Sequence, residues 1–114
     1  MQTLKKYHLT FDIDWAPDFA IDIVLSLLAR YNAKATFFVT HQTDILSDIQ
    51  AHGHELGIHP NFPVNSSHGK RVAEIMENVM RLAPSAKIMR THSLFQSTPM
   101  FIEILKNFPQ LKLA

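Results

Sequence analysis

Hydrophobic residues follow two kinds of pattern, that of strands and that of helices, which alternate along the chain. Four short segments are rich in aromatic and β-branched residues and have the length of strands: Tyr7–Ile13, Ala35–Thr40, His54–Ile58 and Lys87–Thr91. Four longer segments place apolar residues three or four positions apart, as amphipathic helices do: Asp18–Tyr31, Thr43–Ala51, Gly69–Leu82 and Pro99–Asn107. Leu111–Ala114 has the pattern of a strand that is just beginning. The pattern therefore predicts strands and helices in strict alternation.

The predicted helices also carry boundary signals. Pro17 stands where a helix can begin, Thr43 is a candidate N-cap of the second helix, and Gly53 lies just past that helix. Apolar residues of the first helix form two rows at helical spacing, Phe19, Ile23, Leu27 and Ala20, Val24, Leu28. The third helix has one apolar face, made of Val72, Ile75, Met76, Val79 and Leu82.

This alternation indicates βα units, a parallel sheet and right-handed crossovers, so the predicted fold class is α/β. The 114 residues fit a single domain, residues 1–114, and no linker or repeat divides them. Because the chain stops as a fifth strand begins, we expect either a minimal open sheet or the front part of a longer domain, incomplete at its C-terminus. An open sheet edge favours self-association, so a homo-oligomer is one expected state.

Composition excludes several classes of protein. Hydrophobic residues make up 46% and charged residues 18%, as in a globular domain with its own core. A net charge of +1 argues against nucleic acid or an anionic membrane surface as a partner. The apolar runs are too short to cross a bilayer and the N-terminus lacks a secretory h-region, so we expect a cytoplasmic protein. Without cysteine, any metal must be held by nitrogen and oxygen.

Histidines gather in one stretch of the chain, residues 53–69, which reads GHELGIHPNFPVNSSHG. It contains His54, His59 and His68, and its first part alternates like a strand before a polar loop follows. Neutral imidazole binds zinc-like ions well, and strand ends followed by polar loops suit such sites. A histidine-rich composition without function is the alternative. The clustering and the upstream aspartates favour a metal site.

Those aspartates, Asp12 and Asp14, close the first predicted strand. Period two places both carboxylates on one side, at the C-terminal edge where α/β folds place their sites. One can bind a metal while the other takes a proton from water. Alternatively, Asp14 caps the first helix and Asp12 meets an arginine. Two carboxylates at one strand end favour the functional interpretation.

Two further strands end in polar residues at the same edge. The third ends at His59 and the fourth near Arg90 and His92, so three successive strand ends supply Asp, His and Arg or His. Arg90 can pair with Asp12 in a bidentate contact or remain solvated. His92 can contact substrate or cap the strand. This convergence predicts a shared site.

Four motifs resemble those of the polysaccharide deacetylase superfamily, carbohydrate esterase family 4. They are TFDID at residues 10–14, ATFFVT at 35–40, GHELGIHPNF at 53–62 and MRTHS at 89–93, in the family's order. The resemblance implies the first half of a distorted (β/α)7 barrel and a hydrolase that removes N-acetyl groups from amino sugars or related amides with a divalent metal. His and Asp ligands suit several ions, and among them zinc is preferred over nickel, cobalt or manganese. It also implies a glycan or small-molecule substrate.

By position, Asp12 resembles the general base, Asp14 the metal-binding aspartate, His59 the first histidine ligand and Arg90 the arginine that orients the base. Ile13 separates the two aspartates, which are adjacent in the usual motif. The second histidine ligand usually follows four residues after the first, at the position of Pro63 here.

The nearest later histidine is His68, so the predicted metal ligands are Asp14, His59 and His68. His54 is the other candidate, although it would point to the opposite face of its strand. Thr91 and His92 replace the prolines that usually follow the arginine. The usual general acid would lie beyond Ala114, which leaves His92 as a candidate acid.

The mechanism that the resemblance implies uses a metal-bound water as nucleophile, with Asp12 as its base and a histidine that protonates the leaving amine. Two alternatives stay open. One is a truncated or degenerate deacetylase-like domain that binds metal or glycan without catalysis. The other is a haloacid-dehalogenase-like phosphotransferase with Asp12 as nucleophile, an interpretation that leaves His59 and His68 without a role.

Overall fold

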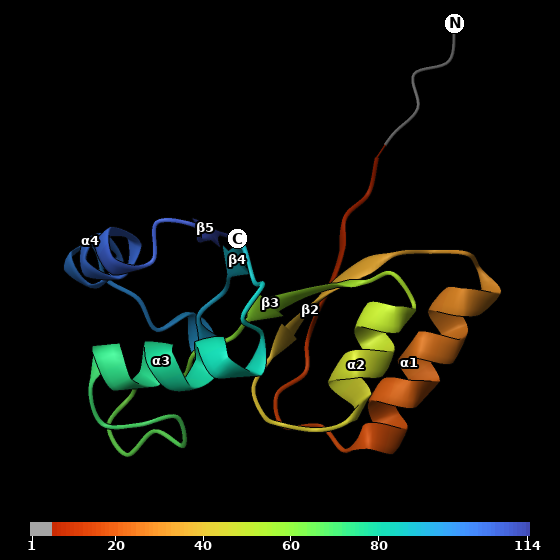
Figure 1. The fold of residues 1–114 in the computed structure, drawn as a ribbon, viewed down its shortest axis with the longest axis horizontal. Coiled ribbons are helices and arrows are strands. Elements are labelled where there is room, and N and C mark those ends of the chain that lie inside the picture. The colour runs from red at the N-terminus through yellow and green to blue at the C-terminus, as the bar shows by residue number, and fades with distance from the viewer. Residues whose placement is uncertain (1–5) are drawn as a thin grey trace, which may run out of the picture.

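A computed structural model of the chain describes residues 6–114 (Figure 1). Its strands are β1 (Leu9–Asp12), β2 (Ala35–Val39), β3 (Glu55–Ile58), β4 (Ile88–Met89) and β5 (Lys112–Leu113). Its helices are α1 (Asp18–Arg30), α2 (Ile45–Ala51), α3 (Val72–Leu82), the short 3-10 helix η1 (His92–Leu94) and α4 (Thr98–Asn107). The predicted alternation and the α/β class are confirmed, and η1 is the one element that the pattern did not predict.

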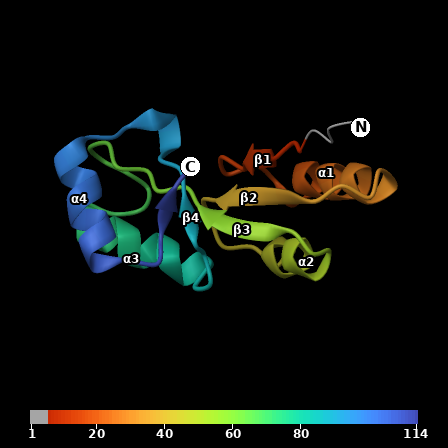
Figure 2. The same ribbon diagram turned by 90° about the horizontal axis from the view of Figure 1, so that it is seen from above.

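The strands form one parallel sheet in the order β1-β2-β3-β4-β5. Each strand therefore lies beside its predecessor, which is the order of a barrel, whereas a doubly wound sheet reverses its order. The helices lie in two pairs, α1 against α2 and α3 against α4. The first pair lies to the right of the central strands in Figure 1 and the second pair to the left, and Figure 2 shows the same division. The sheet resembles the front part of a barrel, as the motifs implied.

Local chemistry explains where two helices end. After α2, Gly53 adopts φ +82°, and its N–H and that of His54 donate to the carbonyls of Gln50 and Ile49. Glycine adopts this left-handed conformation without a steric penalty, so the predicted helix stop is confirmed. After α1, Asn32 takes the same role at φ 49°, a conformation that asparagine tolerates.

The core lies between the helices and one face of the sheet, where β2 contributes Phe37 and Val39 and β3 contributes Leu56 and Ile58. The predicted apolar face of α3 is the buried one, with Ile75, Met76 and Val79 at its centre. In α1 the buried residues are Ile21, Leu25 and Leu28, of which Leu28 belongs to the second predicted row. Of the two predicted rows, Phe19, Ile23 and Leu27 are 70%, 64% and 53% exposed. Because α1 is apolar on most of its circumference, spacing alone did not identify its buried face.

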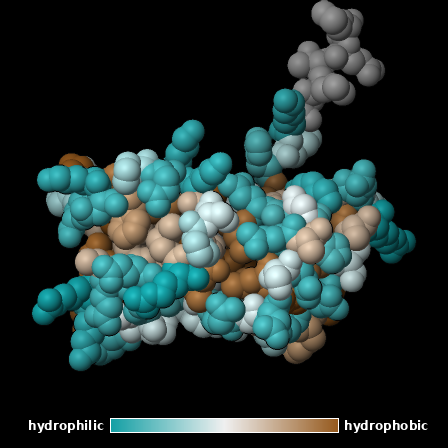
Figure 3. Space-filling model, viewed as in Figure 1, coloured by the Kyte–Doolittle hydropathy of each residue, from teal (hydrophilic) through white to brown (hydrophobic). Residues whose placement is uncertain are grey.

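Apolar side chains also reach the surface, where they appear as brown areas among polar residues (Figure 3). Within residues 6–114, no helix is long and apolar enough to cross a bilayer.

Candidate metal centre

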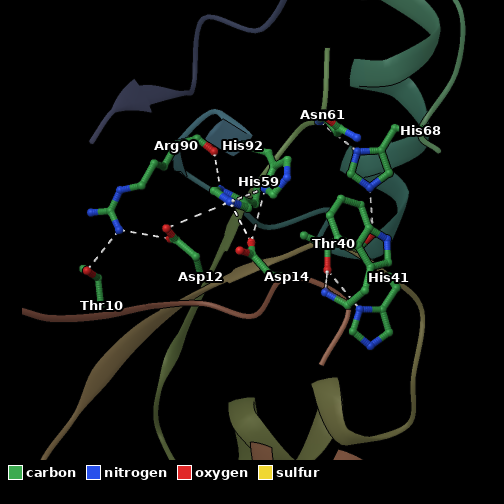
Figure 4. A network of polar contacts seen from close by, with 11 residues as sticks. Thr10, Asp12, Asp14, Thr40, His41, His59, Asn61, His68, Arg90 and His92 are labelled. Atoms are coloured by element: carbon green, nitrogen blue, oxygen red, sulfur yellow. Dashed lines mark hydrogen bonds and ion pairs between the residues drawn. The ribbon is translucent and has the colours of Figure 1, made fainter. Parts of the chain in front are cut away.

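The carboxyl ends of the first, third and fourth strands meet at one edge of the sheet, and polar side chains converge there (Figure 4). Asp12 is the last residue of β1, His59 follows β3, and Arg90 follows β4. Asp14 and His92 lie two residues farther along their own strand ends. The convergence predicted from strand order is present, because parallel strands that are neighbours must end at the same edge.

His59 is held in a single orientation. Its ring is 2% exposed, its backbone N–H donates to the Val39 carbonyl at 3.1 Å, and its Nδ1 lies 2.7 Å from the Arg90 carbonyl. A carbonyl oxygen only accepts, so Nδ1 carries a proton, and in the neutral ring Nε2 keeps a free lone pair. A backbone carbonyl behind a histidine ring is the support that metal-ligating histidines commonly have.

His59 Nε2 faces Asp14 and His92. It lies 3.1 Å from Asp14 Oδ1 and 3.3 Å from His92 Nδ1, and the latter two atoms are also 3.3 Å apart. Each of the three residues offers one ligand atom, and these atoms all lie within 4.8 Å of one another. When the His59 ring is neutral, Asp14 Oδ1 and His59 Nε2 present lone pairs to the same point, and a proton on His92 Nδ1 or a cation there can satisfy both.

One carboxylate oxygen and two imidazole nitrogens are a donor set that suits zinc and similar divalent ions. The residues present therefore fit the metal that the motifs imply. Asp14 is about half exposed on its side chain, at 52%, so the cluster opens to solvent on that side.

Asp12 lies beside this cluster and is paired as predicted. Arg90 Nη1 donates to Asp12 Oδ1 at 3.1 Å and to Thr10 Oγ1 at 3.1 Å. The other carboxylate oxygen of Asp12 lies 4.0 Å from His59 Nε2. Arg90 thus supports both halves of the site, because its carbonyl orients His59 and its guanidinium orients Asp12.

Backbone strain is concentrated around the cluster. Asp14 and Trp15 have φ of 40° and 56°, and Ser93 and Leu94 have φ of 56° and 54°. Left-handed φ in residues other than glycine costs about 1–3 kcal/mol each and is common at functional sites. Two pairs of strained residues thus accompany two candidate metal ligands, Asp14 and His92.

The structure does not bring His68 into the cluster, contrary to the predicted ligand set. Its Nδ1 accepts from the Asn61 backbone N–H at 3.0 Å, and its Nε2 donates to the Thr40 carbonyl at 2.7 Å. Both ring nitrogens are therefore used within the protein (Figure 4). Burial lowers the pKa of His68, with smaller contributions from His59 and His92 in the same direction, so the ring is neutral in this setting. His92 stands where His68 was expected.

Trp15 and Thr40 connect the two histidine environments, and neither was predicted as a site residue. Thr40 Oγ1 accepts from the Trp15 backbone N–H at 2.9 Å and also contacts His41 Nδ1 at 3.0 Å. The Trp15 ring lies 5.4 Å from the His68 ring and packs edge-on against His92 at 5.1 Å. Backbone contacts between loops carry no sequence pattern, which is why these residues were missed.

His54, the other histidine considered as a ligand, lies just before β3, away from this edge of the sheet. Its Nδ1 accepts from the Ala35 backbone N–H at 3.1 Å. Burial, followed by the positive charge of Lys34, lowers its pKa. His54 is thus a structural histidine, pointing away from the site as its place in the strand suggested.

Comparisons with known proteins identify the family. The model of the WbmS-like polysaccharide deacetylase family matches residues 9–113. A solved structure from Bordetella bronchiseptica, described as a polysaccharide deacetylase involved in O-antigen biosynthesis, is 37% identical with a TM-score of 0.81. The match covers 92% of this chain and 44% of that one. A search of curated proteins gave no match.

Two further structures share the fold. The Bdellovibrio bacteriovorus peptidoglycan deacetylase is 25% identical with a TM-score of 0.69, over 94% of this chain and 33% of that one. A CE4 family pseudoenzyme from Bacillus anthracis is 19% identical with a TM-score of 0.66, over 93% and 41%. The chain thus spans less than half the length of these structures. Since the family model covers nearly all of its residues, the chain belongs to the WbmS-like family of polysaccharide deacetylases.

Proposed function

We propose that this chain carries the metal-binding and base part of a deacetylase site that hydrolyses an N-acetyl group on an amino sugar of a glycan. The observation that carries the proposal is the meeting of Asp14, His59 and His92 within 4.8 Å, directly beside the Asp12–Arg90 pair. The family assignment supports the substrate class. The 114 residues are proposed to be a single domain, which spans less than half the length of the related structures.

Asp14, His59 and His92 would hold a divalent transition metal, for which zinc is our proposal. When bound, such an ion supplies Lewis acidity, which lowers the pKa of water and polarises a carbonyl oxygen. His59 contributes through Nε2 because its Nδ1 proton is committed to the Arg90 carbonyl. His92 contributes through Nδ1, and a nitrogen that binds a metal cannot also carry a proton. The role of His92 as ligand therefore replaces its predicted role as general acid at that atom.

Asp12 is proposed as the general base. One oxygen, Oδ1, is fixed by Arg90 at 3.1 Å, while the other, Oδ2, faces the cluster at 4.0 Å from His59 Nε2. With 36% of its side chain exposed, Asp12 can reach water at the opening of the site. A positioned base of this kind contributes about 10²–10⁴-fold to a rate. Arg90 aligns the carboxylate and takes no proton itself.

The test combines metal content with acetate release from N-acetylated amino-sugar oligomers, using the full chain loaded with Zn²⁺. We expect about one ion per chain in the wild type, as the single donor set implies. The Asp12→Asn variant should keep the metal and lose about 10²–10⁴-fold in rate. The His59→Ala variant should lose both metal and activity.

Two results would redirect this proposal. A wild-type chain that binds no divalent ion after reconstitution would overturn the site itself. A chain that binds the ion but releases no acetate from any N-acetylated glycan would favour the alternative of a domain that binds without catalysis. The phosphotransferase alternative does not fit the family to which the chain belongs.

A further inference from the structure

Phe38 is a large apolar side chain on the polar face of the sheet. Neighbouring residues of its strand, Phe37 and Val39, face the helices and belong to the hydrophobic core. Because side chains alternate along a strand, Phe38 points to the opposite face, which it shares with Asp12. It is nevertheless completely buried, with 0% exposure. Something other than the core must therefore cover it.

Arg90 covers one side of the ring. Its guanidinium carbon lies 4.4 Å from the centroid of the Phe38 ring, a distance typical of a cation on an aromatic face. From this position Nη1 reaches both Asp12 Oδ1 and Thr10 Oγ1 at 3.1 Å. The Arg90 side chain is 27% exposed, and an arginine–aspartate pair at such exposure is weakly held by charge alone. A flat support restricts the guanidinium to one plane.

Gly57 allows the ring to lie where it does. In the strand register, Asp12 pairs with Phe38 and Phe38 with Gly57, so the three form one row across the sheet. A Cβ at Gly57 would lie 2.8 Å from Cδ1 and Cε1 of Phe38 and 3.0 Å from Cγ2 of Ile88. Such contacts are too short, so any side chain at this position would displace the ring. The absence of a side chain creates the seat that Phe38 fills.

We propose that Phe38 is a positioning residue for this site: its ring, seated over Gly57, is the platform on which Arg90 lies to hold Asp12 beside the metal ligands. The inference rests on the proposed role of Asp12 for its functional meaning. Its structural content, the dependence of Arg90 on Phe38, can be tested without metal or substrate. Failure of the platform and failure of the deacetylase proposal are therefore distinguishable.

The experiment is NMR of the Arg90 guanidinium in the full chain, with Arg71 as an exposed internal reference. In the wild type we expect an upfield ring-current shift of the Arg90 side-chain protons, an NOE to the Phe38 ring and slow rotation of the Nη groups. The Phe38→Leu variant keeps an apolar residue but removes the aromatic face. It should lose the upfield shift, and Nη rotation should approach that of Arg71.

The matched control is Phe37→Leu, which removes an equally buried ring from the other face of the same strand. It should lower the melting temperature about as much as Phe38→Leu but leave the Arg90 signals unchanged. Gly57→Ala is a second variant that keeps Phe38 and Arg90 and should perturb both sets of signals.

Unchanged Arg90 signals in Phe38→Leu would overturn the proposal, as would equal changes in Phe38→Leu and Phe37→Leu. Should neither variant fold, the wild-type spectrum decides: without the Phe38–Arg90 NOE and the ring-current shift, the platform does not exist.

Discussion

His59 and His68 are buried histidines of the same segment, nine residues apart, yet their ring nitrogens have different hydrogen-bond partners. Each uses one ring nitrogen to donate to a backbone carbonyl, that of Arg90 for His59 and that of Thr40 for His68. The second nitrogen of His68 accepts from the Asn61 N–H, whereas that of His59 faces Asp14. One ring keeps a lone pair available for a cation and the other does not.

Burial and residue type therefore do not identify a metal ligand, whereas the hydrogen-bond state of the second ring nitrogen does. A metal and a backbone N–H compete for the same lone pair. The loop that carries His68 is also fixed by other contacts, since Ser66 Oγ donates to the Asn61 carbonyl and accepts from the His68 N–H. His68 is therefore a part of the loop's own structure.

The largest expected effect is the difference in zinc affinity between variants of His92 and His68. We expect His92→Ala to lower zinc affinity by more than about 100-fold, because it removes one of the three proposed ligands, and changes outside the ligand set alone already cost about 10–100-fold. His68→Ala should keep stoichiometric zinc at protein concentrations where His92→Ala has lost it. Competitive titration with a chromophoric chelator measures both.

The two alanine variants control for each other, since each removes one imidazole from a neighbouring loop. Loss of zinc in His68→Ala together with retention in His92→Ala would reverse the assignment and restore the ligand set expected from sequence. Circular dichroism of both variants establishes that the comparison is made between folded chains.

The second effect concerns stability. His68→Ala leaves the Thr40 carbonyl and the Asn61 N–H without their partner in a buried setting, which costs about 1–3 kcal/mol of unfolding free energy. His92→Ala should cost less in the metal-free protein, because its ring is only partly buried. Urea unfolding in the presence of a chelator measures both changes. A His68→Ala protein as stable as the wild type would show that water replaces the ring without loss.

Most of the fold followed from the sequence because it depends on local signals. Strand and helix order came from hydrophobic period, and helix ends from residues such as Gly53. Which face of α1 is buried did not follow, because Phe19 and Ile21 are equally apolar and only the position of the sheet decides between them.

The candidate site divides in the same way. Asp12, His59 and Arg90 could be placed together, since the ends of neighbouring parallel strands meet at one edge. The choice between His68 and His92 depends on the path of two loops and on a carbonyl of a third segment, and none of these has a sequence pattern. One signal was available, since His92 lies two residues after Arg90 at a strand end that was already assigned to the site.

The third effect is the pH dependence of stability. The pKa of His68 is lowered from its ordinary value of 6.5 by burial, so the unfolded chain binds more protons than the folded one below that pH. The stabilisation is complete above about 6.5 and is lost as pH falls through the folded-state pKa. His54, whose pKa is lowered by the same cause, adds to this trend.

Urea unfolding of the metal-free wild type between neutral and mildly acidic pH should therefore show that the free energy of unfolding decreases as the pH is lowered. The fall should be shallower in His68→Ala and in His54→Ala, and each difference from the wild type isolates one histidine. A wild type and a His68→Ala variant with parallel pH profiles would refute the neutral, buried state of His68.

The smallest effect tests whether the ring or the main chain of His68 anchors its loop. Asn78 Nδ2, on α3, donates to the His68 carbonyl at 2.8 Å. Asn78→Ala removes this hydrogen bond and the exposed one that Arg81 Nη1 donates to Asn78 Oδ1, and it should cost about 0.5–1.5 kcal/mol, less than the loss of the ring, with zinc affinity unchanged. Glu77→Ala, at an exposed neighbouring position, should change stability by less than about 0.5 kcal/mol. A loss of stability in Asn78→Ala equal to that in His68→Ala would mean that α3 fixes the loop through the main chain of His68. The His68 ring would then differ from the His59 ring only in having no free nitrogen.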